Sequence, residues 1–172
     1  MGLNNLYLAI KAQVQAEVPE VAFVAVWNNQ LGDIESQQIY SFPFPALFIE
    51  YQAPAAVKQL GNGYQIFDPL IVRVHIIHEQ LDAQDGTQEQ NLDVFIHREK
   101  VHKALQKFCP DGAVSFVRSN EFPDYDHTNL YHYVIEYTTN YVDVTTSEPI
   151  GAVTTTPPTA LEITKDVLPD RA

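Results

Sequence analysis

The chain has 172 residues, of which 45% are hydrophobic and 19% are charged, so it is long and apolar enough for one domain with a sizeable core. The 10 basic residues stand against 22 acidic ones, and the net charge of −12 argues against binding nucleic acid through basic contacts to phosphates. A single cysteine, Cys109, excludes an intramolecular disulfide.

The N-terminus lacks the basic start and long apolar run of a secretory signal peptide. No stretch approaches the roughly 18 apolar residues of a membrane span. We therefore expect a protein made and folded in a reducing cytoplasm, with no membrane partner.

The first half of the chain predicts a helix followed by strands. Apolar residues recur at helical spacing over 3–18. Residues 21–27 and 46–51 are short runs rich in β-branched and aromatic residues, which is typical of buried strands. A loop or flap over 53–62 ends in a Gly-Asn-Gly turn. Alternation of apolar and polar residues over 70–78 then indicates a half-buried strand.

The second half predicts a helix and two strands. An acidic loop over 79–91 leads into a helix over 92–108, followed by a strand over 113–118. An acidic turn over 120–126 precedes a strand over 130–144 that is longer than usual. The helix should bury a stripe made of Leu92, Phe95, Ile96, Val101, Leu105 and Phe108.

The order α-β-β-β-α-β-β predicts an α+β domain over residues 1–144, with two helices packed on a small, mostly antiparallel sheet. From residue 145 the composition becomes rich in Thr and Pro, so 145–172 is expected to be an extended C-terminal arm. We expect the apolar residues of this arm to dock on a neighbouring subunit; they are Leu161, Ile163, Val167 and Leu168.

No motif for catalysis, a cofactor or a metal stands out. The strongest metal-like cluster is Asp124, Asp126 and His127, but adjacent acidic residues in a turn are more often a solvated loop. Cys109 has no base beside it in sequence except His102, so a spectator thiol is expected. We predict a protein that is not an enzyme, with a small metal-dependent hydrolase as the remaining alternative.

The other histidines also argue against a metal site. His75 and His78 are three apart on a strand and should point to opposite faces, so they do not chelate together. His97 and His102 are five residues apart on a helix, so they do not lie on the same face of it.

Four tyrosines share one face of the last predicted strand. Tyr131 and Tyr133 are expected to face the core. Tyr137 and Tyr141 are predicted to anchor a subunit interface, because tyrosine is enriched in interfaces where its hydroxyl finds a partner.

The pattern over residues 3–144 consists of segments that are read in this order: LNNLYLAIKAQVQAEVPEV, VAVWNNQ, FPFPALFIEYQ, GNGYQIFD, PLIVRVHIIHE, LDVFIHREKVHKALQKF and YHYVIEYTTNYVD. As a whole it resembles the tail terminator family among the neck and tail-completion proteins of tailed bacteriophages. The resemblance rests on the order of the elements and on their residue patterns, and the arm after Val144 departs from it.

The resemblance implies a structural virion protein that forms a ring, usually hexameric, which caps the tail tube and joins it to the head. Its partners would be other copies of itself, tail-tube proteins and head–tail connector proteins, while DNA would pass through without specific binding. Another neck, head-completion or tail-tube component is the alternative. An acidic lumen would keep phosphates off the wall, and the candidate lining residues are Asp82, Asp85, Glu89, Glu121, Asp124 and Asp126.

Overall fold

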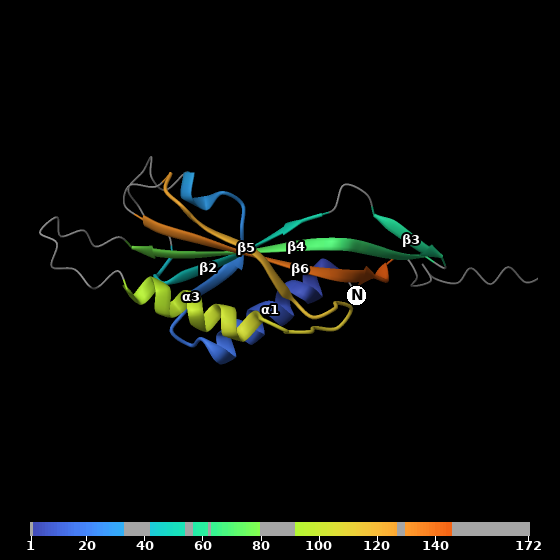
Figure 1. Cartoon of the computed structure of the whole chain (residues 1–172), viewed down its shortest axis with the longest axis horizontal. Coiled ribbons are helices and arrows are strands. Elements are labelled where there is room, and N and C mark those ends of the chain that lie inside the picture. Colours follow the sequence, from blue (N-terminus) through green and yellow to red (C-terminus); the bar gives the residue numbers. More distant parts are fainter. Residues whose placement is uncertain are drawn as a thin grey trace, which may run out of the picture.

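The computed structural model describes residues 2–32, 42–53, 57–61, 63–79, 92–126 and 130–145. These residues form an α+β fold, as the element order predicts, with a short helical turn at 30–32. The elements in chain order are α1 (Leu3–Glu17), β1 (Phe23–Val26), β2 (Ala46–Gln52), β3 (Lys58–Gly61), β4 (Tyr64–Glu79), α3 (Leu92–Leu105), β5 (Val117–Asp124) and β6 (Leu130–Asp143). Figure 1 labels all of them except β1.

Helix α1 forms where the apolar periodicity predicts it. Leu6, Ile10 and Val14 lie on one face and are buried. The backbone N–H of Val18 donates to the carbonyl of Val14 at 2.8 Å and closes the last turn. Pro19 follows, and proline cannot continue a helix.

The strands form one sheet in the order β1-β2-β4-β6-β5, with β3 paired to the outer part of β4. β1 runs parallel to β2, and every other pairing is antiparallel. The central strand β4 pairs with β2 on one side and with β6 on the other, so these three strands hold the sheet together. The expected mostly antiparallel sheet is confirmed.

Side chains point alternately to the two faces of the sheet, and strands β2, β4 and β6 place buried apolar residues on both faces. Helices α1 and α3 cover one face, where Val72, Val74 and Ile76 of β4 are buried (Figure 1). On the other face, Phe48 and Ile77 lie beneath residues of the connection from β1 to β2. In the described part of the chain, the side chains of Arg73 in β4 and Glu136 in β6 stay partly exposed on this face.

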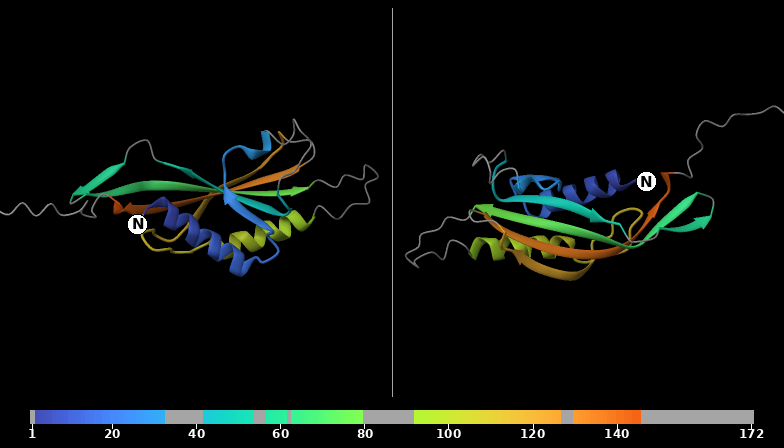
Figure 2. Two further views of the ribbon diagram at one scale, coloured as in Figure 1. Left: turned by 180° about the vertical axis from the view of Figure 1, so that it is seen from behind. Right: turned by 90° about the horizontal axis from the view of Figure 1, so that it is seen from above.

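A hairpin extends the sheet beyond the helices (Figures 1 and 2). The expectation of an unpaired loop over 53–62 is wrong in part, because Lys58–Gly61 forms strand β3. β4 likewise begins at Tyr64 rather than at Leu70. The turn is at the predicted glycines, and both Gly61 and Gly63 have a positive φ. We call β3 together with residues 64–69 the tip hairpin.

Strand β5 differs most from the sequence prediction. The predicted acidic turn over 120–126 is largely strand, because β5 runs from Val117 to Asp124 along β6. Of the predicted strand over 113–118, Ala113 makes only an isolated bridge to Tyr141. β5 is an edge strand and contains Pro123, which lacks the N–H that a further strand would need.

Helix α3 also buries a different stripe from the one predicted. Val94, Val101 and Leu105 are buried, whereas Leu92, Phe95 and Ile96 are exposed. The helix ends at Leu105 instead of residue 108. Three predicted core residues at its N-terminal end are therefore surface residues.

We expect Gly112→Ala to destabilise the protein more than Gly61→Ala does. Both glycines have a positive φ, which costs an L-residue about 1–2 kcal/mol. A Cβ on Gly112 would also lie 3.3 Å from Cε2 of Tyr141 and 3.4 Å from the carbonyl oxygen of Val142, whereas nothing lies within 4 Å of one on Gly61. Urea unfolding measures both variants, and equal midpoints would show that the Gly112 site has room.

Candidate functional site

Two histidines meet in the sheet on the face opposite the helices. His132 of β6 pairs with Ile77 of β4, and His75 lies two residues away from Ile77, so the two imidazoles are diagonal neighbours on one face. Nδ1 of His75 lies 2.9 Å from Nε2 of His132. Both residues are buried, with 5% and 2% of their surface exposed.

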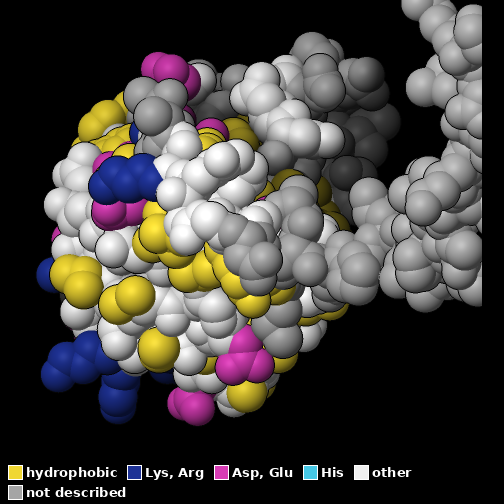
Figure 3. Space-filling view, turned by 90° about the vertical axis from the view of Figure 1, so that its right-hand side faces the viewer, with side chains coloured by type: hydrophobic (Ala, Val, Ile, Leu, Met, Phe, Trp, Pro, Cys, Tyr) yellow, Lys and Arg dark blue, Asp and Glu magenta, His cyan; other side chains and the backbone are white. Residues whose placement is uncertain are grey.

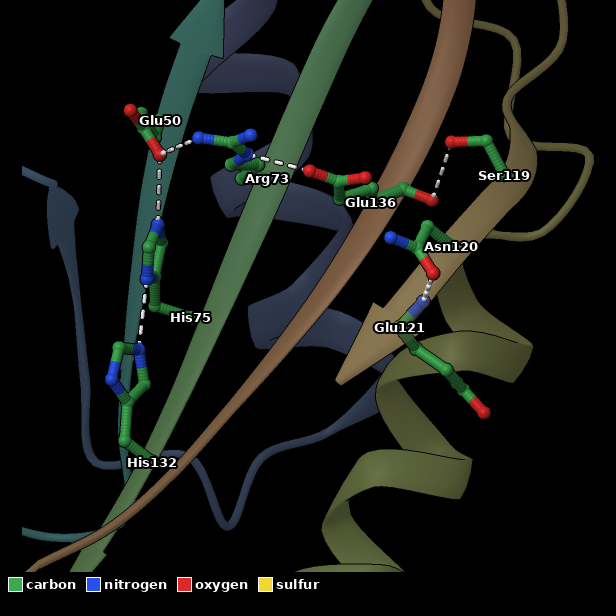
Figure 4. Close-up of polar contacts among 8 residues, drawn as sticks. All are labelled: Glu50, Arg73, His75, Ser119, Asn120, Glu121, His132 and Glu136. Atoms are coloured by element: carbon green, nitrogen blue, oxygen red, sulfur yellow. Dashed lines mark hydrogen bonds and ion pairs between the residues drawn. The ribbon is translucent and has the colours of Figure 1, made fainter. Parts of the chain in front are cut away.

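A carboxylate lies at each end of this histidine pair. Oε2 of Glu50 in β2 is 3.2 Å from Nε2 of His75. Oδ2 of Asp124 in β5 is 3.1 Å from Nδ1 of His132, which makes an ion-pair contact there. We call these four residues the histidine chain; it crosses strands β2, β4, β6 and β5 (Figure 4 draws all but Asp124). About a third of each carboxylate side chain is exposed, so the chain has solvent at both ends and none at its centre.

Arg73 connects the histidine chain to a second carboxylate (Figure 4). Its Nε donates to Oε1 of Glu136 at 2.7 Å, and its Nη1 lies 3.5 Å from Oε2 of Glu50. The hydrogen bond with Glu136 is the main reason that the pKa of Arg73 is raised. The guanidinium therefore stays charged beside Glu50.

Trp27, at the start of the β1–β2 connection, packs against both imidazoles of the histidine chain. Its ring is stacked on His75 with centroids 4.1 Å apart and planes at 6°, and it is tilted against His132 at 5.5 Å. Burial, followed by the nearby charge of Arg73, lowers the pKa of His75 to about 4. His75 is thus neutral at pH 7.

The arrangement is a row of ionisable groups that can bind and hold protons. Within the described ranges, no group of three or more His, Cys, Asp or Glu side chains could hold a metal ion. The hydroxyl of Ser119 donates to the backbone carbonyl of Glu136, and the thiol of Cys109 donates to the backbone carbonyl of Ala113. Neither of these hydroxyl and thiol groups is directed at an imidazole as an activated nucleophile would be.

Three other described histidines make contacts on the helix side of the sheet. His78 lies against His97 of α3 with ring centroids 4.8 Å apart, so His75 and His78 do point to opposite faces as predicted. Nδ1 of His102 is 3.2 Å from the hydroxyl of Tyr137, which places His97 and His102 in separate contacts.

Tyr137 and Tyr141 belong to the core of the protomer. Both have 0% of their surface exposed, and Tyr137 packs against Phe116. The prediction that these two tyrosines anchor a subunit interface is wrong, because their face of β6 lies under the helices and the 108–116 segment. The other predicted interface residues, Leu161, Ile163, Val167 and Leu168, lie outside the described residues, as does the arm after Thr145.

Of the two predicted lining loops, the structure describes only the one with Glu121, Asp124 and Asp126, and Glu121 and Asp124 lie on opposite faces of β5. Glu121 faces the helix side of β5 and accepts hydrogen bonds from Arg98 and Arg118. Asp124 faces the other side, where Oδ1 accepts from the backbone N–H of Asp126 and Oδ2 contacts His132. Asp126 is exposed, whereas Asp82, Asp85, Glu89 and His127 lie outside the described residues. Of the Asp124, Asp126 and His127 cluster, the structure therefore describes only the two carboxylates.

Two exposed apolar surfaces lie at opposite ends of the molecule (Figure 1). We give the name tip surface to three exposed apolar residues on and beside the tip hairpin, Val57, Leu60 and Tyr64, which lie on both faces of the hairpin. Figure 3 looks onto this end, where hydrophobic side chains gather between a few charged groups. The helix surface consists of Leu92, Phe95 and Ile96 at the start of α3.

Sequence reasoning missed the histidine chain and both apolar surfaces. His75 and His132 are 57 residues apart, and only the register of β4 against β6 brings them together. The one available signal was polar residues at inward positions of two apolar strands. The helix surface was mistaken for core because its residues also recur at helical spacing.

No known family model matches the chain, and no curated protein is similar to it in sequence. Among the described residues, no helix is long and apolar enough to cross a membrane.

Proposed function

We propose that the protein is a structural, ring-forming component of a phage virion that ends the tail tube and joins it to the head. The observation that carries this proposal is the pair of exposed apolar surfaces at opposite ends of the protomer. Surfaces of this kind are typical of sites where another protein binds.

The placement of the two surfaces favours association of copies from head to tail. β4 alone has 16 residues and spans roughly 50 Å, so one end of a protomer does not fold back onto the other. If the tip surface of one copy packs on the helix surface of the next, each copy uses two different surfaces. Such heterologous contacts give closed rings when the rotation between neighbours divides a full turn.

The identity of the ring comes from the element order, which resembles the tail terminator family. A hexamer around a DNA channel, located in the virion after assembly in the host cytoplasm, is the form that this resemblance implies. The net charge of −12 supports a passage that repels phosphates. Tail-tube and head–tail connector proteins are the proposed partners.

A different neck, head-completion or tail-tube component is the second candidate, because the same two surfaces would serve any head-to-tail ring. Mixing the purified protein with tail tubes from its phage separates the two in electron micrographs. A terminator caps tube ends, whereas a tube component adds along the tube or polymerises by itself.

A charge placed in either apolar surface should abolish the ring and leave the protomer folded. We expect Leu60→Asp in the tip surface and Ile96→Asp in the helix surface each to give monomers by light scattering. A charge buried in an apolar contact is costly, whereas one on an exposed surface is not. Leu8→Asp is the control, because Leu8 is 51% exposed, close to Leu60 at 59% and Ile96 at 48%.

Mixing the two defective variants tests the head-to-tail arrangement itself. Leu60→Asp keeps a sound helix surface and Ile96→Asp keeps a sound tip surface, so an equal mixture should form one good contact and stop at heterodimers. Rings formed by both variants alone would show that these surfaces are not the contact. A wild-type protein that stays monomeric, alone and with tail tubes, would contradict the ring.

A further inference from the structure

The three contacts of the histidine chain need three protons. Two are hydrogen bonds, Glu50 to His75 at 3.2 Å and His75 to His132 at 2.9 Å, and the third is the ion-pair contact of His132 with Asp124 at 3.1 Å, which also calls for a proton on His132. Ionised carboxylates only accept, and a neutral imidazole has one N–H and one lone pair. Two neutral histidines therefore supply two protons, and one contact would set two lone pairs against each other.

We infer that the histidine chain is a proton-binding site, in which His132 is held as an imidazolium at neutral pH while His75 stays neutral. In this state both nitrogens of His132 carry protons and face Oδ2 of Asp124 and Nδ1 of His75. His75 accepts on Nδ1 and donates from Nε2 to Glu50. All three contacts are then filled.

The surroundings place the extra proton on His132 rather than elsewhere in the chain. An imidazole is more basic than a carboxyl group by about two pKa units, which favours a histidine over Glu50 or Asp124. Arg73 lies on the Glu50 side and disfavours a second positive charge at His75, whose pKa burial also lowers. His132 contacts the carboxylate of Asp124, whose charge favours a cation there, whereas Arg73 offsets the charge of Glu50 beside His75.

The bound proton connects the edge strand to the centre of the sheet. Asp124 is the last residue of β5, and its contact with His132 joins β5 to β6. The neutral His75 of β4 contacts Glu50 of β2 in turn. Arg73 forms ion pairs with both Glu50 and Glu136, so its positive charge offsets theirs. Loss of the proton at alkaline pH would leave one contact unfilled and loosen the end of β5.

The test is a side-chain NMR titration of the full-length histidine-labelled protein, with probes at the ring nitrogens. We expect His132 to be protonated on both nitrogens at pH 7 and to titrate above its ordinary pKa of about 6.5. His75 should be neutral, with its proton on Nε2. Asp124→Asn should weaken proton binding by His132 at least tenfold. A His132 that is neutral at pH 7 would overturn the inference.

Asp126→Asn is the matched control, because Asp126 is an exposed carboxylate two residues away whose backbone, not its side chain, contacts Asp124. It should change the affinity of His132 for the proton less than twofold. A group whose folded pKa is raised stabilises the fold below its unfolded pKa and loses that effect as pH rises through the folded value. The melting temperature of the wild type should therefore fall above neutral pH, and that of Asp124→Asn should not. Equal titrations of His132 in the two asparagine variants would also reject the site, and neither result depends on whether rings form.

Discussion

Replacing Tyr137 with alanine should lower the free energy of unfolding by about 3–5 kcal/mol, the range for deleting a buried aromatic ring. Tyr137 has 0% of its surface exposed, its ring packs against Phe116, and its hydroxyl contacts Nδ1 of His102. The substitution removes these contacts and leaves a cavity between the sheet and the helix layer. Urea unfolding followed by circular dichroism measures the loss.

Tyr125→Ala is the control for the Tyr137 substitution. Tyr125 has the same chemistry and is 80% exposed, so its removal should change the stability by no more than about 0.5 kcal/mol. If both variants were equally stable, Tyr137 would not be part of the core, and its earlier interpretation as an interface residue would regain support.

Acidification from pH 6.5 to pH 4 should cost the folded state about 3 kcal/mol through His75 alone, the equivalent of about 2.5 pKa units. The pKa of His75 is lowered to about 4 by burial and by Arg73, while the unfolded chain takes up the proton near 6.5. The unfolded state therefore binds more protons within this window, and stability is lost as pH falls through it. Urea midpoints measured at pH 6.5 and at pH 4 give the loss.

His75→Gln should flatten this acid dependence without abolishing it. His78 has its pKa lowered to about 4 by burial and by the charge of His97, so it titrates in the same window. A double substitution of His75 and His78 should flatten it further, and the carboxylates and His102, whose pKa is also lowered by burial, account for what remains. An unchanged slope in His75→Gln would mean that His75 is not buried as a neutral imidazole.

Elements whose pattern is local were predictable from the sequence. α1, β2 and β6 have a helical or strand periodicity that nothing else in the chain contradicts, and the structure forms them within one or two residues of the predicted bounds. β3 and β5 were not predictable in this way. β3 is exposed along its whole length and β5 along most of it, so neither has an alternation of apolar and polar residues; pairing with a longer neighbour holds both strands in place.

The site depended even more on tertiary structure. The sequence correctly separates His75 from His78, because faces alternate along a strand. It says nothing of His132 as a partner, because a shift of one residue in the β4–β6 register would turn that imidazole to the other face. The same dependence explains the two tyrosines: only the docking of the helix layer shows that residues 137 and 141 are covered.

The sheet order has a consequence for how the chain folds during synthesis. The central strand β4 lies between β2, which precedes it, and β6, whose Glu136 is 63 residues beyond Arg73 in the chain. When β4 leaves the ribosome, one of its edges has a partner and the other has none until α3, β5 and most of β6 have been made. The apolar residues that α1 and α3 finally cover also stay accessible over this interval. Folding is therefore dominated by late, non-local pairing, and the nascent chain passes through a stage with a long unpaired edge, which is the kind of intermediate that chaperones protect.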